Sequence, residues 1–141
     1  MKEKILETLD DLGFRLNKLD ALGYSFEFEG LNYLLIDDEE DENYIRLSVP
    51  SFYDRSEDNQ AVCAAITERL NSSLKYVKVY EVSNSISIFY EHALFGGENY
   101  EALLEHMVAC LYSAFIFATK TIAELEHAAD GTETNGEGDE D

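Results

Sequence analysis

Histidine and cysteine, the side chains that most often bind metals or act as nucleophiles, are few in this sequence and widely separated. His92, His106 and His127 lack the HxxH and HExxH spacings, and no carboxylate stands at ligand spacing from them. Cys63 and Cys110 form no CxxC pair and lie among alanine, valine and leucine. An unpaired cysteine in such surroundings behaves as a small apolar side chain. We therefore expect buried free thiols, no metal site and no cofactor.

The densest group of ionisable side chains is the run DDEEDE at residues 37–42. Carboxylates are ligands that calcium prefers, but Glu42 stands where a calcium loop of the EF-hand type needs glycine. Charge runs of this kind normally remain hydrated. The run therefore predicts a solvated acidic loop, with weak and nonspecific cation association as its only ligand chemistry.

Motifs for nucleotide binding and for hydrolysis are missing from the sequence. GxGxxG and GxSxG do not occur, and the pair Gly96 and Gly97 is followed by Glu98 where a phosphate-binding loop carries lysine. The serines from Ser83 to Ser87 have no histidine base in their sequence context. We expect a non-enzymatic protein. A small-ligand-binding protein, or a hydrolase whose catalytic groups meet only in the folded chain, stays open as the alternative.

Charge restricts the partners of this chain. The formal net charge is −20, and the acidic run together with residues 129–141 carries more than half of it. Phosphate backbones and anionic lipid surfaces repel such a chain, so neither nucleic acid nor a membrane is an expected partner. The acidity serves solubility or a basic protein partner.

The sequence shows no targeting or membrane-spanning segment. The first residues, MKEKILETLDDLGFRL, alternate charge with leucine and contain neither a continuous apolar core nor a small-residue cleavage site. The apolar segment at residues 106–119 is shorter than the roughly 20 residues that a bilayer crossing needs. These features predict a soluble protein with a cytoplasmic location.

Hydrophobic periodicity predicts three helices and five strands as the elements that must position these side chains. The strands alternate apolar and polar residues, or are apolar on both faces, and short turns separate them. Pro50 closes the third strand, and Ser83 and Asn84 form a two-residue turn between the last two. The expected order is helix 3–22, strands 24–29, 31–36 and 43–50, helix 56–74, strands 76–82 and 85–92, and a helix that opens at Glu98 and Asn99.

Single residues mark several boundaries of these elements. Gly23 ends the first helix, and Ser56 is the expected cap of the second. Asn71 is placed to cap the end of that second helix. Gly96 and Gly97 supply positive φ ahead of the last helix.

These elements predict an α+β fold: a helix, a three-strand antiparallel meander, a helix, a β-hairpin and a long C-terminal helix. A chain of 141 residues with 45% hydrophobic residues fits one domain with a sizeable core. That domain is expected to span residues 1–128. Residues 129–141 are glycine-rich and acidic, and predict a disordered tail.

The alternation divides the expected sheet into two faces. The core side is expected to carry apolar side chains of four strands, namely Phe26, Phe28, Ile45, Leu47, Val49, Val77, Val79, Ile86 and Ile88. The opposite side is expected to carry Tyr44, Tyr76, Tyr80 and Phe89, with Leu34 and Ile36. This aromatic face is either covered by a helix or open to a ligand or partner strand. Its four aromatic residues are candidates for protein binding.

The segment HMVACLYSAFIFAT, residues 106–119, places apolar side chains all around a helix and contains no formally charged residue. A surface helix would show a polar stripe at a 3.6-residue period, so more than one side of this helix is expected to be covered. One sheet covers one side. Another part of the chain, a second copy or a partner must cover the other, and Tyr112, Phe115 and Phe117 are further candidates for protein binding.

Several local patterns between residues 66 and 111 carry a family resemblance. They are Leu70-Asn71 at a helix end, a strand from Lys78 to Tyr80, the hairpin that follows, and the run LFGG from Leu94 before the long helix. In these patterns the chain resembles the YbjN-like family, described as bacterial sensory transduction regulators. The element order resembles that family over about residues 3–125, whereas the acidic run at 37–42 departs from its pattern.

The YbjN-like family is similar in fold to the class I type III secretion chaperones. Those chaperones are small, acidic, usually dimeric proteins that hold an extended segment of a client. The resemblance implies a non-enzymatic interaction or regulatory module, chaperone-like and homodimeric, whose partner is another protein or a second copy of itself. A chaperone dedicated to a secreted client is the alternative. The resemblance supplies no catalytic residues.

Overall fold

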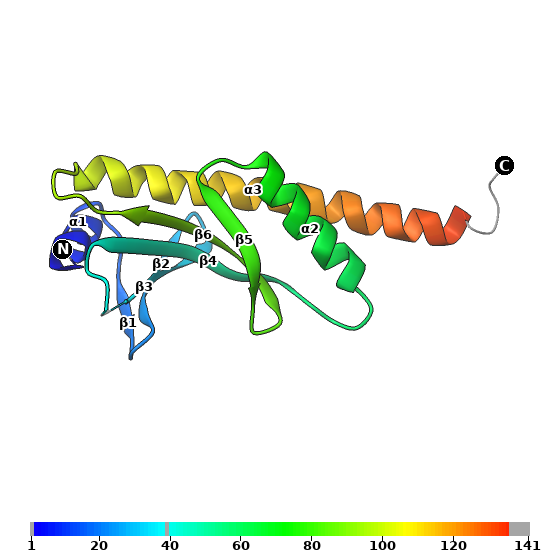
Figure 1. Cartoon of the computed structure of the whole chain (residues 1–141), viewed down its shortest axis with the longest axis horizontal. Helices are drawn as coiled ribbons and strands as arrows, with labels where there is room; N and C mark the ends of the chain where they lie inside the picture. Colours follow the sequence, from blue (N-terminus) through cyan, green and yellow to red (C-terminus); the bar gives the residue numbers. More distant parts are fainter. Residues whose placement is uncertain (1, 39, 136–141) are drawn as a thin grey trace.

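The chain folds into one antiparallel sheet of six strands with three helices (Figure 1). The computed structural model describes residues 2–38 and 40–135, with the backbone alone for 131–135. The strand order is β1-β2-β3-β4-β6-β5. The elements are α1 Lys2–Asp11, β1 Asn17–Leu19, β2 Gly23–Phe28, β3 Leu31–Ile36, β4 Tyr44–Asp54, α2 Gln60–Ser73, β5 Val77–Val82, β6 Ser85–Ala93 and α3 Tyr100–Asn135. The predicted α+β fold is confirmed, and the five predicted strands follow in the expected order after one further strand, β1.

All three helices pack on the same face of the sheet, and the core lies between the two layers. In one row across the sheet, Leu35 of β3, Leu47 of β4 and Tyr90 of β6 stand side by side and are buried. The helix α3 runs over this face, where the Tyr33 hydroxyl donates a hydrogen bond of 2.9 Å to the carbonyl of Val108. Apolar residues of α1 and α2 join the same buried cluster.

The predicted core residues of the strands are confirmed on this face. Phe28 and Val77 are partly buried, and the other seven residues predicted for the core are buried. The Phe26 and Tyr33 rings stack across the β2–β3 pair, with centroids 5.1 Å apart. The alternation in the sequence therefore identified the core side of the sheet correctly.

The first helix is shorter than predicted. It ends at Asp11, and Gly13 takes a φ of +98°, a left-handed conformation that stops a helix. The chain then forms β1, a three-residue edge strand that pairs with β2 and is exposed throughout. The leucines that continue the helical spacing diverge: Leu16 packs against the core, while Leu19 and Leu22 are exposed.

Strand β4 passes through Pro50 instead of ending there. The register with β6 shifts between Val49 and Tyr53, and Ser51 has a φ of +54°. A bulge accommodates proline, which has no N–H to donate to the ladder. The Ser51 N–H donates a hydrogen bond of 2.9 Å to the Ser87 hydroxyl at this point. The strand thus continues beneath α3 and ends at Asp54, next to the loop that leads into α2.

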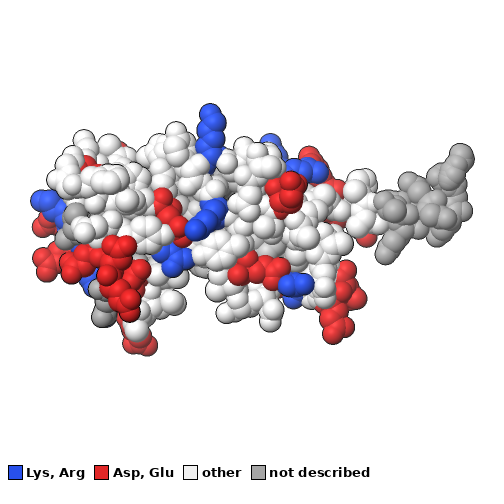
Figure 2. Space-filling view, viewed as in Figure 1, with Lys and Arg blue, Asp and Glu red and all other residues white. Residues whose placement is uncertain are grey.

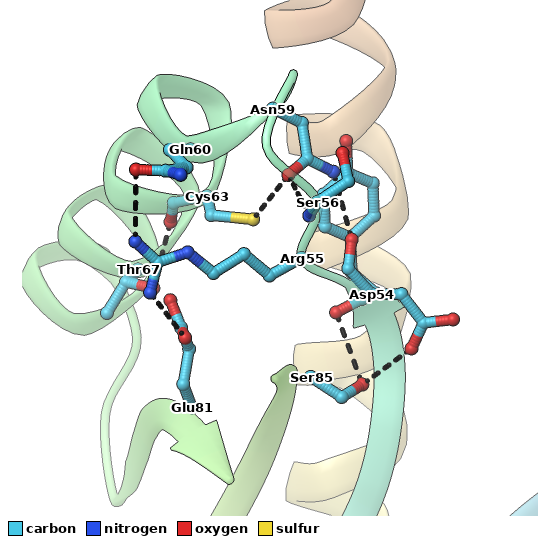
Figure 3. A network of polar contacts seen from close by, with 10 residues as sticks. Asp54, Arg55, Ser56, Asn59, Gln60, Cys63, Thr67, Glu81 and Ser85 are labelled. Atoms are coloured by element: carbon cyan, nitrogen blue, oxygen red, sulfur yellow. Dashed lines mark hydrogen bonds and ion pairs between the residues drawn. The ribbon is translucent and has the colours of Figure 1, made fainter. Parts of the chain in front are cut away.

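Polar side chains hold the loop between β4 and α2, and Ser56 is not the helix cap (Figure 3). The N-cap residue is Asn59, whose side chain turns back into the loop. Its Oδ1 accepts a hydrogen bond of 2.7 Å from the Ser56 N–H, and its Nδ2 donates one of 2.9 Å to the carbonyl of Asp54. Arg55 adds an ion pair of 3.0 Å with Glu81 of β5. The loop, α2 and the hairpin therefore form one connected unit.

The Asn71 side chain does not cap the end of α2, where Leu74 is the C-cap residue. Its amide instead donates to the carbonyl of Val79 and accepts from the Val79 N–H, each at 2.8 Å. Strand β5 is an edge strand, and Asn71 occupies the two backbone groups that a further strand would use. This side chain closes the sheet edge at its middle.

The start of α3 agrees with the sequence. Asn99 caps the helix, because its Oδ1 accepts a hydrogen bond of 3.0 Å from the Ala102 N–H. Gly96 has the predicted positive φ, +105°, but Gly97 does not. The Glu98 carboxylate accepts hydrogen bonds from two backbone N–H groups of the preceding turn, one of them that of Gly96.

The end of α3 differs from the sequence-based domain boundary. The helix continues to Asn135, so residues 129–135 are helical although they were predicted to belong to a disordered tail. Residues 136–141 of that tail lie outside the described residues. The final turns of the helix project beyond the sheet (Figure 1).

Candidate protein-binding surface

The long helix α3 buries one stripe against the sheet. The buried residues recur at spacings of three and four, which places them on one side of a helix. They are Leu104, Met107, Val108, Leu111, Ala114, Ala118 and Thr121. This stripe is the inner side that the sheet was expected to cover.

The opposite side of α3 is exposed and carries no charge over four positions. His106, Ala109, Ser113 and Ile116 also recur at spacings of three and four, and all four are exposed. We call these four residues the outer stripe. Apart from the Tyr76 and Tyr90 rings beside His106, no segment among residues 2–38 and 40–135 covers them, and Ile116 is 41% exposed. Of the three covers considered for this helix, other parts of the described chain cover its flanks, where α2 and α1 contact it, but not the outer stripe.

An aromatic group stands beside the outer stripe. Tyr76 has a φ of +70° and is 63% exposed, and its ring stacks on Tyr90 with centroids 6.0 Å apart. The ring also meets His106 edge-on at 4.9 Å. Tyr76 was predicted on the face of the sheet opposite the core, and this placement is wrong. The residue lies just before β5, and the left-handed backbone turns its ring to the helix side.

The pair of His106 and Cys110 is the nearest approach to a nucleophile and base. The Cys110 sulfur lies 3.4 Å from Nε2 of His106, and the Tyr90 hydroxyl lies 3.1 Å from Nδ1. Burial raises the pKa of the Cys110 thiol, which disfavours the thiolate form that acts as the nucleophile in cysteine catalysis. Cys63 is buried as predicted, whereas Cys110 is only half-buried, and both are free.

The open face of the sheet, on the side away from the helices, holds three of the four aromatic candidates. The rings of Tyr80 and Phe89 stack with centroids 4.4 Å apart. The Arg46 guanidinium lies 5.1 Å from the centre of the Phe89 ring and donates a hydrogen bond of 2.7 Å to the Tyr80 hydroxyl. No helix of the described chain covers this face, yet Phe89 is only 5% exposed. Its neighbours on the sheet bury it.

The charges of the open face are paired with each other. Glu91 accepts from Arg46 at 3.1 Å and from Lys78 at 2.8 Å. Burial opposes ionisation of Glu91, but hydrogen bonds from Lys78 and Tyr44 and the two cationic charges lower its pKa. Burial, and then the hydrogen bond to Glu91, raise the pKa of Tyr44 to about 12. These charged groups therefore satisfy one another, while the buried Ser48 hydroxyl on the same face has no hydrogen-bond partner.

The three aromatic candidates on α3 lie on its flanks and are partly buried. Tyr112 meets Phe28 edge-on, with ring centroids 5.7 Å apart. Phe115 meets Phe52 of β4 in the same way at 6.3 Å, and Phe117 packs against the core. The Tyr112 and Phe115 rings thus attach α3 to the sheet. The exposed side of this segment is formed by His106, two small residues and Ile116, and not by the three aromatic candidates.

Length and composition alone would allow α3 to cross a membrane. Residues Tyr100–Asp130 have a mean hydropathy of 1.5 over their most apolar window. A core helix of a soluble protein passes the same test, and α3 contributes a full buried stripe to the core under the sheet. Within the described residues, no group of three or more His, Cys, Asp or Glu side chains could hold a metal ion.

Comparisons with known proteins identify the fold. No family model and no curated protein matches the sequence. An uncharacterised protein from Methanothermobacter thermautotrophicus has a similar structure, with a TM-score of 0.61 at 17% identity over 87% of this chain and 96% of that one. YbjN from E. coli, described as a candidate transcription regulator, has a TM-score of 0.54 at 16% identity over 94% of this chain and 93% of its own. The chain therefore shares the YbjN fold.

Proposed function

We propose that this protein is a non-enzymatic interaction module, regulatory or chaperone-like, that forms a homodimer through the outer stripe of α3. One observation carries the proposal: the outer stripe is exposed and uncharged on a helix whose other side is already in the core. The YbjN fold supports a relation to the YbjN-like family and a regulatory role. The net charge of −20 supports a protein partner over nucleic acid or a membrane.

A second copy fits this stripe because of charge and side-chain size. Two chains that each carry −20 repel one another wherever carboxylates face each other, and the outer stripe contains none. Ala109 and Ser113 at its centre allow a second helix to approach closely. A two-fold axis near these residues would bring the stripe against itself, so one surface would serve both copies. Exposed Tyr76 would lie at the margin of the same contact.

The test is the mass of the protein in solution, with a matched pair of variants. We expect sedimentation equilibrium at high micromolar concentration to give about twice the 16.0 kDa of one chain. Ala109→Arg places a charge in the outer stripe and should return the protein to a monomer. Ala64→Arg, at an exposed alanine of α2, should leave the dimer intact.

Two results would contradict the dimer. One is a monomeric wild-type protein, and the other is equal masses for the Ala109→Arg and Ala64→Arg variants. If the protein is monomeric, and a stoichiometric partner from lysate binds the wild type but not Ala109→Arg, the stripe serves a client. That result would favour the dedicated chaperone. The cytoplasmic location stays a prediction and can be checked by fractionation of the source cells.

A further inference from the structure

A cavity of about 430 Å³ opens between α1, the start of β2, the end of β3 and the start of β4. This volume falls in the range of sites that hold small organic ligands. Its apolar and aromatic lining comes from six side chains in four elements of the fold, namely Ile5, Tyr24, Leu35, Ile36, Tyr44 and Ile45. None of the lining residues that the structure describes belongs to α3, so the cavity is separate from the proposed dimer surface.

Carboxylates dominate the polar part of the cavity lining. Five acidic residues line it, against one cationic residue, Lys2, among the described residues. The acidic residues are Glu3, Asp37, Asp38, Asp41 and Glu42. Figure 2 shows acidic side chains gathered at this end of the molecule, near α1 and the connection from β3 to β4. Asp37, Asp38, Asp41 and Glu42 thus form one wall of the cavity, while Asp38, Glu40, Asp41 and Glu42 are also exposed to solvent, as predicted for this loop.

The chain places its own ammonium group against this wall. The Lys2 Nζ lies 3.2 and 3.0 Å from the two carboxylate oxygens of Asp37. The Asp37 side chain is only 6% exposed, while that of Lys2 is 45% exposed. A carboxylate so deeply placed needs a cationic partner. The geometry of Lys2 shows that an ammonium group on an aliphatic stem fits this position.

We propose that the cavity binds an organic cation, an amine or guanidine on an aliphatic stem, with its head on Asp37 and its stem over the apolar lining. The ligand replaces Lys2, which is long and exposed enough to swing into solvent. The apolar lining separates this site from a metal site, since Ile5, Leu35 and Ile45 offer a metal no ligand atoms. The cation is either a free amine or the lysine or arginine side chain of a basic peptide. Both present a cationic head on an aliphatic stem, which is what the cavity would recognise.

The proposal can be tested by titration calorimetry on the full chain. Agmatine is the free probe because it joins an amine and a guanidine by a short aliphatic stem. Guanidinium chloride at low concentration is the head-only control. A capped peptide with one arginine represents the side-chain source. We expect agmatine to bind with one site per chain, and guanidinium to bind at least 10-fold more weakly because it has no stem.

Two pairs of variants separate the cavity from general attraction to an acidic protein. Asp37→Asn should weaken agmatine binding by about 10-fold or more, because a charge-assisted hydrogen bond in a shielded site is lost. Glu68→Gln removes the same charge from exposed α2 and should change binding less than about twofold. Lys2→Met removes the internal competitor and should tighten binding several-fold. Lys4→Met removes an exposed lysine of α1 outside the cavity and should not.

Each result decides the proposal. If agmatine and the peptide both bind with these variant effects, a partner side chain is a source that the cavity accepts. Binding of agmatine alone assigns the cavity to a free amine. No binding of either probe overturns the proposal, as do equal effects of Asp37→Asn and Glu68→Gln. If all four variants remain dimeric, the cavity variants leave the dimer unaffected, and a failed cavity proposal does not count against the proposed function.

Discussion

Replacing Asn71 with alanine should destabilise the protein well beyond a surface substitution. The side chain satisfies both the N–H and the C=O of Val79, at 2.8 Å each, and Val79 is 1% exposed. A hydrogen bond contributes a net 0.5–1.5 kcal/mol, and a shielded group left without a partner costs about 1–3 kcal/mol. Asn71 is exposed, so in the variant water can satisfy part of what the Val79 backbone loses at the edge of β5. We therefore expect a loss of about 2–3 kcal/mol in the free energy of unfolding.

The size of the effect can be read from thermal and urea denaturation. For 141 residues the entropy of unfolding is roughly 0.3 kcal/mol per kelvin, so the loss corresponds to a fall in Tm of about 7–10 °C. In urea the midpoint should fall while the slope m stays constant, because the surface exposed on unfolding is unchanged. Ser72→Ala is the matched control, since Ser72 is exposed and neighbours Asn71 on the same helix.

A third variant tests which of the two hydrogen bonds matters. Asn71→Asp keeps an acceptor for the Val79 N–H but turns a carboxylate oxygen toward the Val79 carbonyl. We expect it to be as unstable as the alanine variant at neutral pH and to recover in part below about pH 4, where the carboxyl group gains a donor proton. A loss below about 0.5 kcal/mol for Asn71→Ala, equal to that of Ser72→Ala, would refute the closed-edge reasoning.

The remaining predictions concern the backbone and the response to pH. Gly23→Ala should abolish folding or cost several kcal/mol, because a Cβ there would collide with a backbone carbonyl of β3 at a φ of +145°, whereas Gly97→Ala has open space and should be nearly neutral by circular dichroism. Burial and the bond to Glu126 raise the Tyr53 pKa to about 12, so stability should fall between pH 10 and 12 as the unfolded phenol ionises first, and less steeply in Tyr53→Phe. The lowered pKa of Glu91 should stabilise the fold above the unfolded value near 4.5, and Glu91→Gln should flatten the loss on acidification below that value.

The strands and their faces were predictable because alternation is a local property of the sequence. Phe26 and Phe28 of β2, and Ile86 and Ile88 of β6, reach the core as the two-residue period requires. The turn at Ser83 and Asn84 was also predictable from its length, and both residues have the positive φ of a tight hairpin turn, 54° and 64°.

The helix boundary and the strand through Pro50 were not predictable from periodicity. Leu16, Leu19 and Leu22 continue the spacing of the first helix, but Gly13 ends it, and β1 has no buried residue to reveal a strand. Pro50 normally ends a strand, and only the pairing with β6 across the bulge keeps β4 intact. Tertiary pairing decides both cases.

The two candidate surfaces also differ in how far the sequence predicted them. The outer stripe was visible as a charge-free segment, because helical spacing is local. The cavity was not, since Ile5, Tyr24 and Ile45 meet only after α1 folds onto the strands. The contact of Asn71 with Val79 likewise depends on how α2 lies against β5. Contacts between residues far apart in the sequence leave no local pattern from which they could be predicted.

The distribution of charge makes the two proposed surfaces respond to salt in opposite directions. Copies of a chain with a net charge of −20 repel each other, and salt screens that repulsion. The dimer through the uncharged outer stripe should therefore tighten as sodium chloride rises from about 0.05 to 0.5 M. Binding of agmatine to the carboxylates around Asp37 should weaken over the same range, because the same screening removes attraction. Sedimentation and calorimetry on one preparation can measure both. A shift of both affinities in the same direction would mean that charge does not separate the surfaces as the structure indicates.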